Sequence, residues 1–302
     1  MIEARELTKR YGGKTAVDTL TFTVRPGRVT GFLGPNGAGK STTLRLALGL
    51  HEPSSGTVTV DGVRFRDRPR GLRHVGALLD AHDVHGGRTG RAHLAALARS
   101  NRIPRTRVDQ VLAEVGLADS ARRRVGGYSL GMKQRLGIAG ALLGDPPVLL
   151  FDEPLNGLDP EGVQWVRVLF RRLAAEGRTV FVSSHLMSEM EHTADELVVI
   201  GRGTLIAAES LADFAARAGA PAVTLRTPEA AVLTPLLTAE GATVRAEAGL
   251  LTVTGLPAAR ISELAFQYKV RLHELTTHRP SLEEAFMELT ADSVEYVAGE
   301  AR

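Results

Sequence analysis

The sequence predicts an α/β protein built on a parallel β-sheet, followed by a smaller α+β unit. Two observations predict the larger part. A glycine-rich segment, GPNGAGKST at residues 34–42, lies between the strand pattern VTGFLG and a helical pattern. The segments VLLF and VFVS are apolar without polar alternation, which is typical of strands buried on both faces of a parallel sheet. The order of patterns after residue 221 predicts the α+β unit.

The first elements predict an antiparallel β region. ARELTKRY and TLTFTVRP alternate like paired strands, with the turn residues Gly12 and Gly13 between them. After VTGFLG, a helix is expected from Lys40 to about Gly49. GTVTVDGV then predicts another strand, followed by a turn.

A helical subdomain is expected at about residues 85–145. From about Arg91 to Leu143, alanine and leucine recur at helical spacing. The α/β rhythm then resumes with PVLLFDEP, a helix at 163–175, the strand TVFVSSH, a short helix at 187–193 and the strand ELVVIGRG. The helical subdomain is therefore set into an α/β domain.

A second unit is expected after a change of composition at residues 218–221, which gives domains at 1–215 and 216–302. Its patterns are VTLR, a helix from Glu229, TVRAE, LLTVTG, a helix from Ala258, VRLHEL and a final helix at SLEEAFMEL. This β-α-β-β-α-β order with an extra helix predicts a small ferredoxin-like sandwich. Ser281 and Glu284 form a capping box for the last helix.

Composition excludes several classes of protein. The 302 residues include no cysteine, which excludes disulfides and thiolate metal sites and is compatible with a cytoplasmic location. The net charge of +3 is too small to indicate nucleic-acid binding. No apolar run is long enough to span a membrane, and the N-terminus has no signal-peptide pattern.

Three arginine-rich segments stand out, at residues 64–73, 99–107 and 122–124. Solvated faces and loops explain them in the simplest way. Contact with anionic lipid headgroups, or with an acidic loop of a partner, is the alternative.

Residues 34–42 satisfy the complete phosphate-loop pattern between a strand and a helix. Gly37 and Gly39 allow backbone N–H groups to surround the β- and γ-phosphates, Lys40 adds a positive charge, and Ser41 offers a hydroxyl to Mg²⁺. The residues expected to bind ATP here are Gly34, Pro35, Asn36, Gly37, Ala38, Gly39, Lys40, Ser41 and Thr42.

Two adjacent carboxylates follow the strand VLLF, at the edge of a parallel sheet where ligands gather. Asp152 is expected to reach Mg²⁺ through water. Glu153, on the other side of the pleat, is expected to hold the attacking water as general base. A helix-capping acid pair is the structural alternative, but the apolar run before the pair and Pro154 after it favour an active-site loop.

His185 ends the strand FVSSH and is therefore expected beside the same γ-phosphate. It would sense that phosphate or polarise the transition state, and Lys40 is the third residue expected to take part in catalysis. Tyr11, on the antiparallel sheet, is expected to stack on adenine; packing of an edge strand is the alternative.

The segment YSLGMKQRLG predicts a helix start, with Ser129 as N-cap and Gly131 after it, and a helix N-terminus is also an anion site. Together with the phosphate loop, the acid pair, His185 and Leu158-Asp159, it makes residues 1–215 resemble the nucleotide-binding domain of an ABC transporter. The motifs stand in the family's order and at its usual separations. YSLGMKQ occupies the place of the family's signature sequence, usually LSGGQ.

The resemblance implies a P-loop NTPase fold of the ABC type and a head-to-tail dimer of two copies around ATP and Mg²⁺. In this family the signature helix of one subunit covers the γ-phosphate held by the phosphate loop of the other. Ser129 and Gly131 are therefore expected to bind the nucleotide of a second chain, and Asp159 is also expected among the nucleotide-binding residues. A monomer is expected to be inert toward hydrolysis.

The sequence departs from the family pattern at three positions. Leu130 replaces the first signature glycine and Met132 replaces the glutamine, so fewer polar groups reach the nucleotide. Asp80 stands where the family has a glutamine; an ionised carboxylate can ligate Mg²⁺ but cannot donate a hydrogen bond. We expect these changes to affect the strength of coupling.

These variants, with TGRAHL and the tail ending SLEEAFMELT, are similar to the bacterial drug, bacitracin and lantibiotic exporters. The similarity implies an ATPase subunit at the inner face of the cell membrane, bound to a separate integral membrane permease. The alternative is a soluble ABC ATPase that acts on ribosomes or DNA, which the single ABC domain and the lack of sustained heptads oppose. A sensor that binds ATP without turnover is opposed by the presence of Glu153 and His185.

Overall fold

The computed structural model describes residues 1–217, 222–247, 250–278 and 282–291. It divides into two compact units, of which the first contains Met1–Leu211 and the described residues from Leu289, and the second contains Ala212–Glu288. The predicted boundary at 218–221 lies outside the described residues, as does Ser281 of the predicted capping box.

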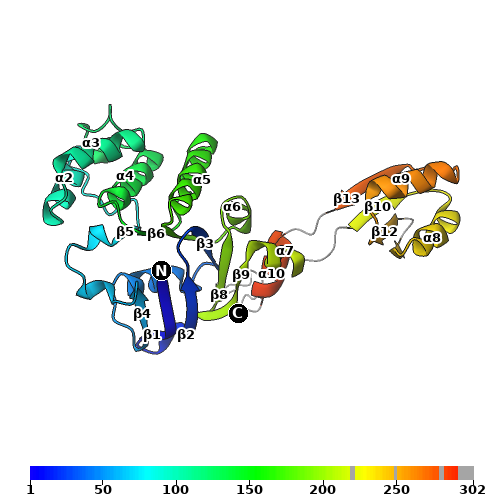
Figure 1. Ribbon diagram of the computed structural model, residues 1–302, viewed down its shortest axis with the longest axis horizontal. Helices are drawn as coiled ribbons and strands as arrows, with labels where there is room; N and C mark the ends of the chain where they lie inside the picture. The colour runs from blue at the N-terminus through cyan, green and yellow to red at the C-terminus, as the bar shows by residue number, and fades with distance from the viewer. Residues whose placement is uncertain (218–221, 248–249, 279–281, 292–302) are drawn as a thin grey trace, which may run out of the picture. The chain divides into compact units, whose positions relative to one another are not determined.

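The first unit contains two β-sheets (Figure 1), a six-stranded sheet of order β5-β6-β7-β3-β8-β9 and a three-stranded sheet of order β2-β1-β4. All neighbours in the larger sheet pair in parallel except β8 and β9, and the smaller sheet is antiparallel. The predicted parallel core and antiparallel β region are therefore confirmed. The strands are β1 (Ile2–Tyr11), β2 (Lys14–Val24), β3 (Arg28–Leu33), β4 (Ser55–Val60), β5 (Val75–Leu78), β6 (Val148–Phe151), β7 (Thr179–Ser184), β8 (Glu196–Gly201) and β9 (Thr204–Ser210).

Apolar packing joins the two sheets. Every residue of β6, β7 and β8 is buried, as the unbroken apolar patterns predict. Phe22 of the smaller sheet packs against Phe32 and Phe181 of the larger one, with both ring centroids 5.8 Å away. This shared core fixes the strands whose ends carry the predicted site residues.

Side chains cap three helices of the first unit, and Ser129 is the one that the sequence predicts as a cap. Thr89 caps α2, Ser129 caps α4 and Asp159 caps α5, each by accepting a backbone N–H of the first turn. In Figure 1, α2, α3 and α4 gather on the side of the sheet that ends at β5. The helices of this unit are α1 (Lys40–Ala47), α2 (Gly90–Ser100), α3 (Arg105–Glu114), α4 (Leu130–Leu142), α5 (Pro160–Ala175) and α6 (Met187–Glu191), with 3-10 turns at Phe65–Asp67, Gly71–Arg73 and Val125–Gly127. α7 (Leu211–Arg217) starts at the boundary, and its residues after Leu211 belong to the second unit.

The second unit contains an antiparallel sheet of order β11-β12-β10-β13 with its own apolar core. β12 lies between β10 and β11, the split β-α-β arrangement of ferredoxin-like sandwiches. Its elements, in the predicted order, are β10 (Ala222–Arg226), α8 (Ala230–Ala239), β11 (Thr243–Glu247), β12 (Leu250–Thr254), α9 (Ala258–Gln267), β13 (Glu274–His278) and α10 (Leu282–Thr290). Across both units, none of the described helices has the length and apolarity to cross a lipid bilayer.

The contact between β5 and α4 gives a test of the packing. A Cβ at Gly76 of β5 would lie 1.9 Å from the carbonyl oxygen of Ala141 in α4, so an alanine must push the helix away. We predict that Gly76→Ala lowers the free energy of unfolding by about 2–3 kcal/mol, measured by urea denaturation. Gly13→Ala is the matched control because a Cβ there meets no atom within 4 Å. Equal losses in the two variants would contradict this packing.

Candidate nucleotide site

Strand register brings the predicted site residues together at one edge of the larger sheet. In the parallel pairing of β6 with β7, Phe151 lies beside Val182, and in the pairing of β3 with β7, Leu33 lies beside Ser184. The segments that follow these strands carry the phosphate loop, the acid pair and His185. All three therefore emerge side by side at the carboxyl edge.

A cleft of about 420 Å³ lies at this edge, and most of the predicted nucleotide-binding residues line it. Its walls include Tyr11, Glu153 and the phosphate loop from Pro35 to Thr42, without Gly34. Gly39 has φ +102°, and a Cβ there would lie 2.4 Å from the carbonyl oxygen of Ala16, so only glycine fits. The loop leads directly into α1. The first backbone N–H groups of a helix have no intrahelical acceptor and can therefore bind an anion.

Lys40 is buried at the base of this cleft. Its Nζ donates hydrogen bonds to the carbonyl oxygens of Gly34 (2.6 Å) and Pro35 (3.3 Å) and lies 3.6 Å from Oε1 of Glu153. Burial lowers the pKa of Lys40 below its ordinary value, while the carboxylates of Glu153 and Asp152 oppose that shift. The ammonium group is thus held where it can meet a phosphate.

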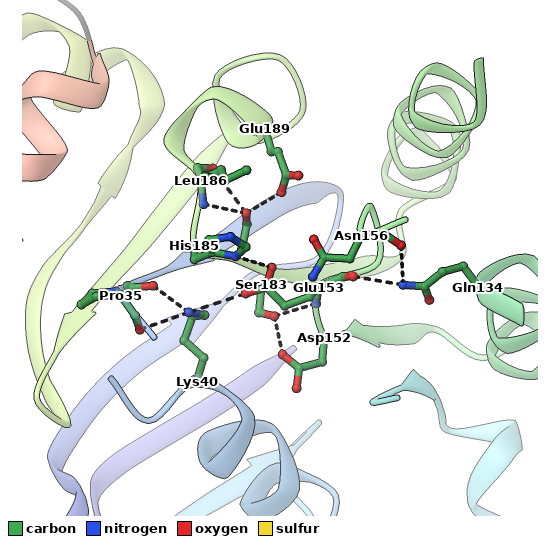
Figure 2. Close-up of polar contacts among 12 residues, drawn as sticks. Pro35, Lys40, Gln134, Asp152, Glu153, Asn156, Ser183, His185, Leu186 and Glu189 are labelled. Carbon is green, nitrogen blue, oxygen red and sulfur yellow. Dashed lines mark hydrogen bonds and ion pairs between the residues drawn. The ribbon is translucent and has the colours of Figure 1, made fainter. Parts of the chain in front are cut away.

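Glu153 links the phosphate loop to His185. Its Oε2 lies 2.8 Å from Nδ1 of His185, while Oε1 faces Lys40; Figure 2 shows this chain of contacts. The backbone of Glu153 is in the left-handed region, with φ +46°, which is unusual for a residue other than glycine. A strained backbone therefore carries the predicted general base.

Ser183, which sequence reasoning missed, orients both members of the acid pair (Figure 2). Its hydroxyl donates to Oδ1 of Asp152 (2.5 Å) and accepts the backbone N–H of Glu153 (2.9 Å). The signal that could have revealed it is its position on β7, two residues before His185 and beside the strand that carries the acid pair.

A second missed residue, Glu189 of α6, supports the loop that carries His185. Ser184 donates a hydrogen bond to Oε2 of Glu189 (2.5 Å), and the N–H of Leu186 donates to the Ser184 hydroxyl (3.0 Å). Burial raises the pKa of Glu189, and the hydrogen bond from Ser184 partly offsets this. These bonds fix the backbone on either side of His185.

The residues of the signature segment lie outside the cleft of their own chain. Ser129 Oγ accepts the N–H of Met132 (3.2 Å) as the N-cap of α4, and Asp159 Oδ1 accepts the N–H of Gly162 (2.8 Å) as the N-cap of α5. Leu130, which replaces the signature glycine, packs against Gly157. Ser129 and Asp159 are both exposed.

Asp80 lies two residues beyond β5, the strand that pairs with β6. Its Oδ1 accepts the backbone N–H of His82 (2.7 Å) and lies 3.0 Å from Nδ1 of the same residue. The backbone hydrogen bond from His82 lowers the pKa of Asp80, with a smaller contribution from Arg45, so the carboxylate is ionised at neutral pH. Asp80 does not line the cleft.

The donor set fits a Mg²⁺ ion that arrives with a nucleotide. Asp152 is buried, and Ser183 occupies one carboxylate oxygen and leaves the other as a ligand. In the described parts of the chain, no three His, Asp or Glu residues gather into a complete metal cage. Mg²⁺ characteristically takes one or two carboxylates and completes its shell with phosphate oxygens and water, which matches Asp152 and the hydroxyl of Ser41.

The arginine-rich segments have different surroundings. Within 64–73, Arg68 donates to the carbonyl oxygen of Val60, and Arg73 donates to that of Arg102. Residues from the other two segments, Arg105 and Arg122, line a hollow of about 400 Å³ on the helical subdomain. Arg68 and Arg73 are therefore tied into the fold, whereas Arg105 and Arg122 are exposed.

The chain is similar to known ABC transporter ATP-binding proteins. Residues 17–156 match the family model described as ABC transporter, and residues 221–283 match a domain of unknown function. The chain is 36% identical, over 98% of both chains, to YhcH of Bacillus subtilis, an uncharacterized ABC transporter ATP-binding protein. It is 43% identical, over 68% of both chains, to the bacitracin transport ATP-binding protein BcrA of Bacillus licheniformis.

Two further comparisons extend this agreement. The Nod factor export ATP-binding protein I of Burkholderia orbicola is 40% identical over 68% of this chain and 69% of its own. A solved ATP-binding subunit of an ABC transporter has a TM-score of 0.66 at 27% identity, over 72% of this chain and 92% of its own. The fold and the site define an ATPase of the ABC type. The chain belongs to the ABC transporter ATP-binding proteins, and the predicted family and its binding of ATP are confirmed.

The position of Ser183 predicts a specific kinetic effect. Ser183→Ala removes the hydroxyl that orients Asp152 and the Glu153 backbone, so we expect kcat for ATP to fall by about 10- to 100-fold. KM is expected to change less, since the phosphate loop is untouched; steady-state ATPase assays measure both. Ser188→Ala, at an exposed serine of α6, is the matched control. Equal kcat values for the two variants would show that Ser183 does not position the site.

Proposed function

We propose that this chain is the ATP-hydrolysing subunit of an ABC export system, in which two copies close head to tail around two ATP–Mg²⁺ complexes. The observation that carries the proposal is the Glu153 carboxylate, which lines the phosphate-loop cleft and contacts both Lys40 and His185. A carboxylate between a phosphate-binding lysine and a histidine is suited to hydrolysis rather than to binding alone.

In this proposal the phosphate loop binds and orients the β- and γ-phosphates through its N–H groups and Lys40. Ser41, Asp152 and Asp80 are the residues that would hold Mg²⁺. When bound, the ion supplies positive charge that offsets the charge on the transferring phosphoryl group. The hydrogen bond from Ser183 keeps Asp152 in place for this role.

Glu153 acts as the general base. It takes a proton from a water molecule as the water oxygen bonds to the γ-phosphorus and the bond to the leaving ADP breaks. His185 holds the Glu153 carboxylate through Nδ1, and we propose that it also contacts the γ-phosphate. Tyr11 is 45% exposed at the cleft wall, which supports stacking on adenine, although its ring also contacts His51 edge-on.

The dimer is proposed because Ser129 and Leu130, at the start of the signature helix, are exposed, and the signature segment lies outside the cleft of its own chain. The N-terminus of α4, with Ser129 and Gly131, offers an anion site that a second chain's γ-phosphate would occupy. Asp159 lies at the N-terminus of α5, close in sequence to the acid pair, and would contact the nucleotide in the same interface. Hydrolysis then needs two chains.

Export is supported by the relatives, one of which is named for bacitracin transport and another for Nod factor export. We propose a drug or antimicrobial peptide as the exported compound and an integral membrane permease on a separate chain. The permease would bind between the helical subdomain and the core and hold this chain at the inner membrane face. We propose domains at 1–215 and 216–302, and no nucleic-acid partner.

Replacing the general base tests this proposal. Glu153→Gln keeps the shape of the side chain but cannot accept the proton, so we expect kcat to fall at least 100-fold while ATP still binds. The variant is expected to elute as a dimer in size-exclusion chromatography with ATP and as a monomer with ADP. Glu191→Gln, at an exposed position of α6, is the matched control. A Glu153→Gln protein that stays monomeric with ATP contradicts the sandwich.

A further inference from the structure

Gln134 joins the signature helix α4 to the loop that carries Glu153 (Figure 2). Its Nε2 donates hydrogen bonds to the backbone carbonyl oxygens of Glu153 and Asn156, both at 3.2 Å. An amide nitrogen has two hydrogens, so this group is fully used. The two carbonyls are the ends of one turn, because the N–H of Asn156 donates to the carbonyl oxygen of Glu153 (3.3 Å).

Burial of the Gln134 amide costs free energy. The side chain is 5% exposed, and its Oε1 is buried without a hydrogen-bond partner in the described parts of the chain. An unmet buried acceptor destabilises a fold, and a leucine of similar size would avoid the cost. Packing alone therefore does not explain a glutamine at this position, whereas its two donated hydrogen bonds do.

Those bonds act on the strained residue of the site. The N–H of Glu153 donates to Ser183 of β7, and its carbonyl accepts from Gln134 of α4. Glu153 has φ +46°, a conformation that persists only where its surroundings impose it. Two elements thus hold the peptide groups on either side of the general base: the sheet holds one and the signature helix holds the other.

We infer that Gln134 is a positioning residue that couples the placement of α4 to the Glu153 carboxylate of the same chain. The inference rests on the proposed dimer, in which the N-terminus of α4 contacts the nucleotide of the second chain. A shift of α4 changes the hydrogen bonds of Gln134 and thereby the position of the Glu153 carboxylate. Each hydrolytic site is therefore regulated by the nucleotide that its own signature helix contacts in the opposite site.

The test uses two full-length copies joined by a flexible linker, with Glu153→Gln in one copy so that a single site turns over. Gln134→Leu is then placed either in the copy with the intact Glu153 or in the Glu153→Gln copy. In the second arrangement the substituted α4 belongs to the Glu153→Gln copy. Its N-terminus still contacts the nucleotide of the hydrolysing copy, but it makes no hydrogen bond to the intact Glu153. We expect kcat to fall about 10- to 100-fold in the first arrangement and less than about threefold in the second, with KM changed little in both.

Controls separate this inference from other causes. Gln134→Met, which keeps the length of the side chain, is expected to give the same asymmetry, and Gln164→Leu, at an exposed position of α5, is expected to give neither effect. Equal losses in both arrangements indicate a general defect of α4 and overturn the inference, as does an unchanged kcat in the first. If a tandem of two wild-type copies does not hydrolyse ATP while the separate wild-type chains do, the proposed dimer fails and the inference falls with it.

Discussion

The parallel register of β3, β6 and β7 is the constraint on which the rest of the site depends. It aligns three strand ends so that the phosphate loop, the acid pair and His185 emerge side by side. The hydroxyl of Ser183 then bonds across the β6–β7 pair to Asp152 and to the backbone of Glu153. A shift of one residue in this pairing would turn Ser183 to the opposite face and separate the site residues.

The site carries polar and strained groups that the core must stabilise. Lys40, Asp152 and Gln134 are buried, and Glu153 has a left-handed backbone, each of which costs free energy unless partners compensate. The compensation comes from fully buried strands and from the phenylalanines that pack the two sheets together. A rigid apolar platform thus allows the site to keep charged groups close together, out of water and correctly aimed.

Local signals made much of the fold and site predictable. The phosphate loop, the buried strands and the cap of α4 are marked by neighbours in sequence, whereas β5 and β9 were not predicted as strands. β5 has only four residues and depends on pairing with β6. The positions of Ser183 and Glu189, and the hydrogen-bonding role of Gln134, were missed for a similar reason. Their partners lie on other elements or across a turn, and no spacing rule marks a serine or glutamine that bonds to a distant backbone group.

The dependence of ATPase activity on protein concentration tests the central claim most directly, namely that hydrolysis needs the signature helix of a second chain. Wild-type protein would be diluted through the range in which the dimer dissociates, at saturating Mg²⁺-ATP. The account predicts that the rate per chain falls in proportion to concentration at the dilute end, because active sites form by association. A rate per chain that stays constant on dilution, from a protein shown to be monomeric under the same conditions, would contradict it.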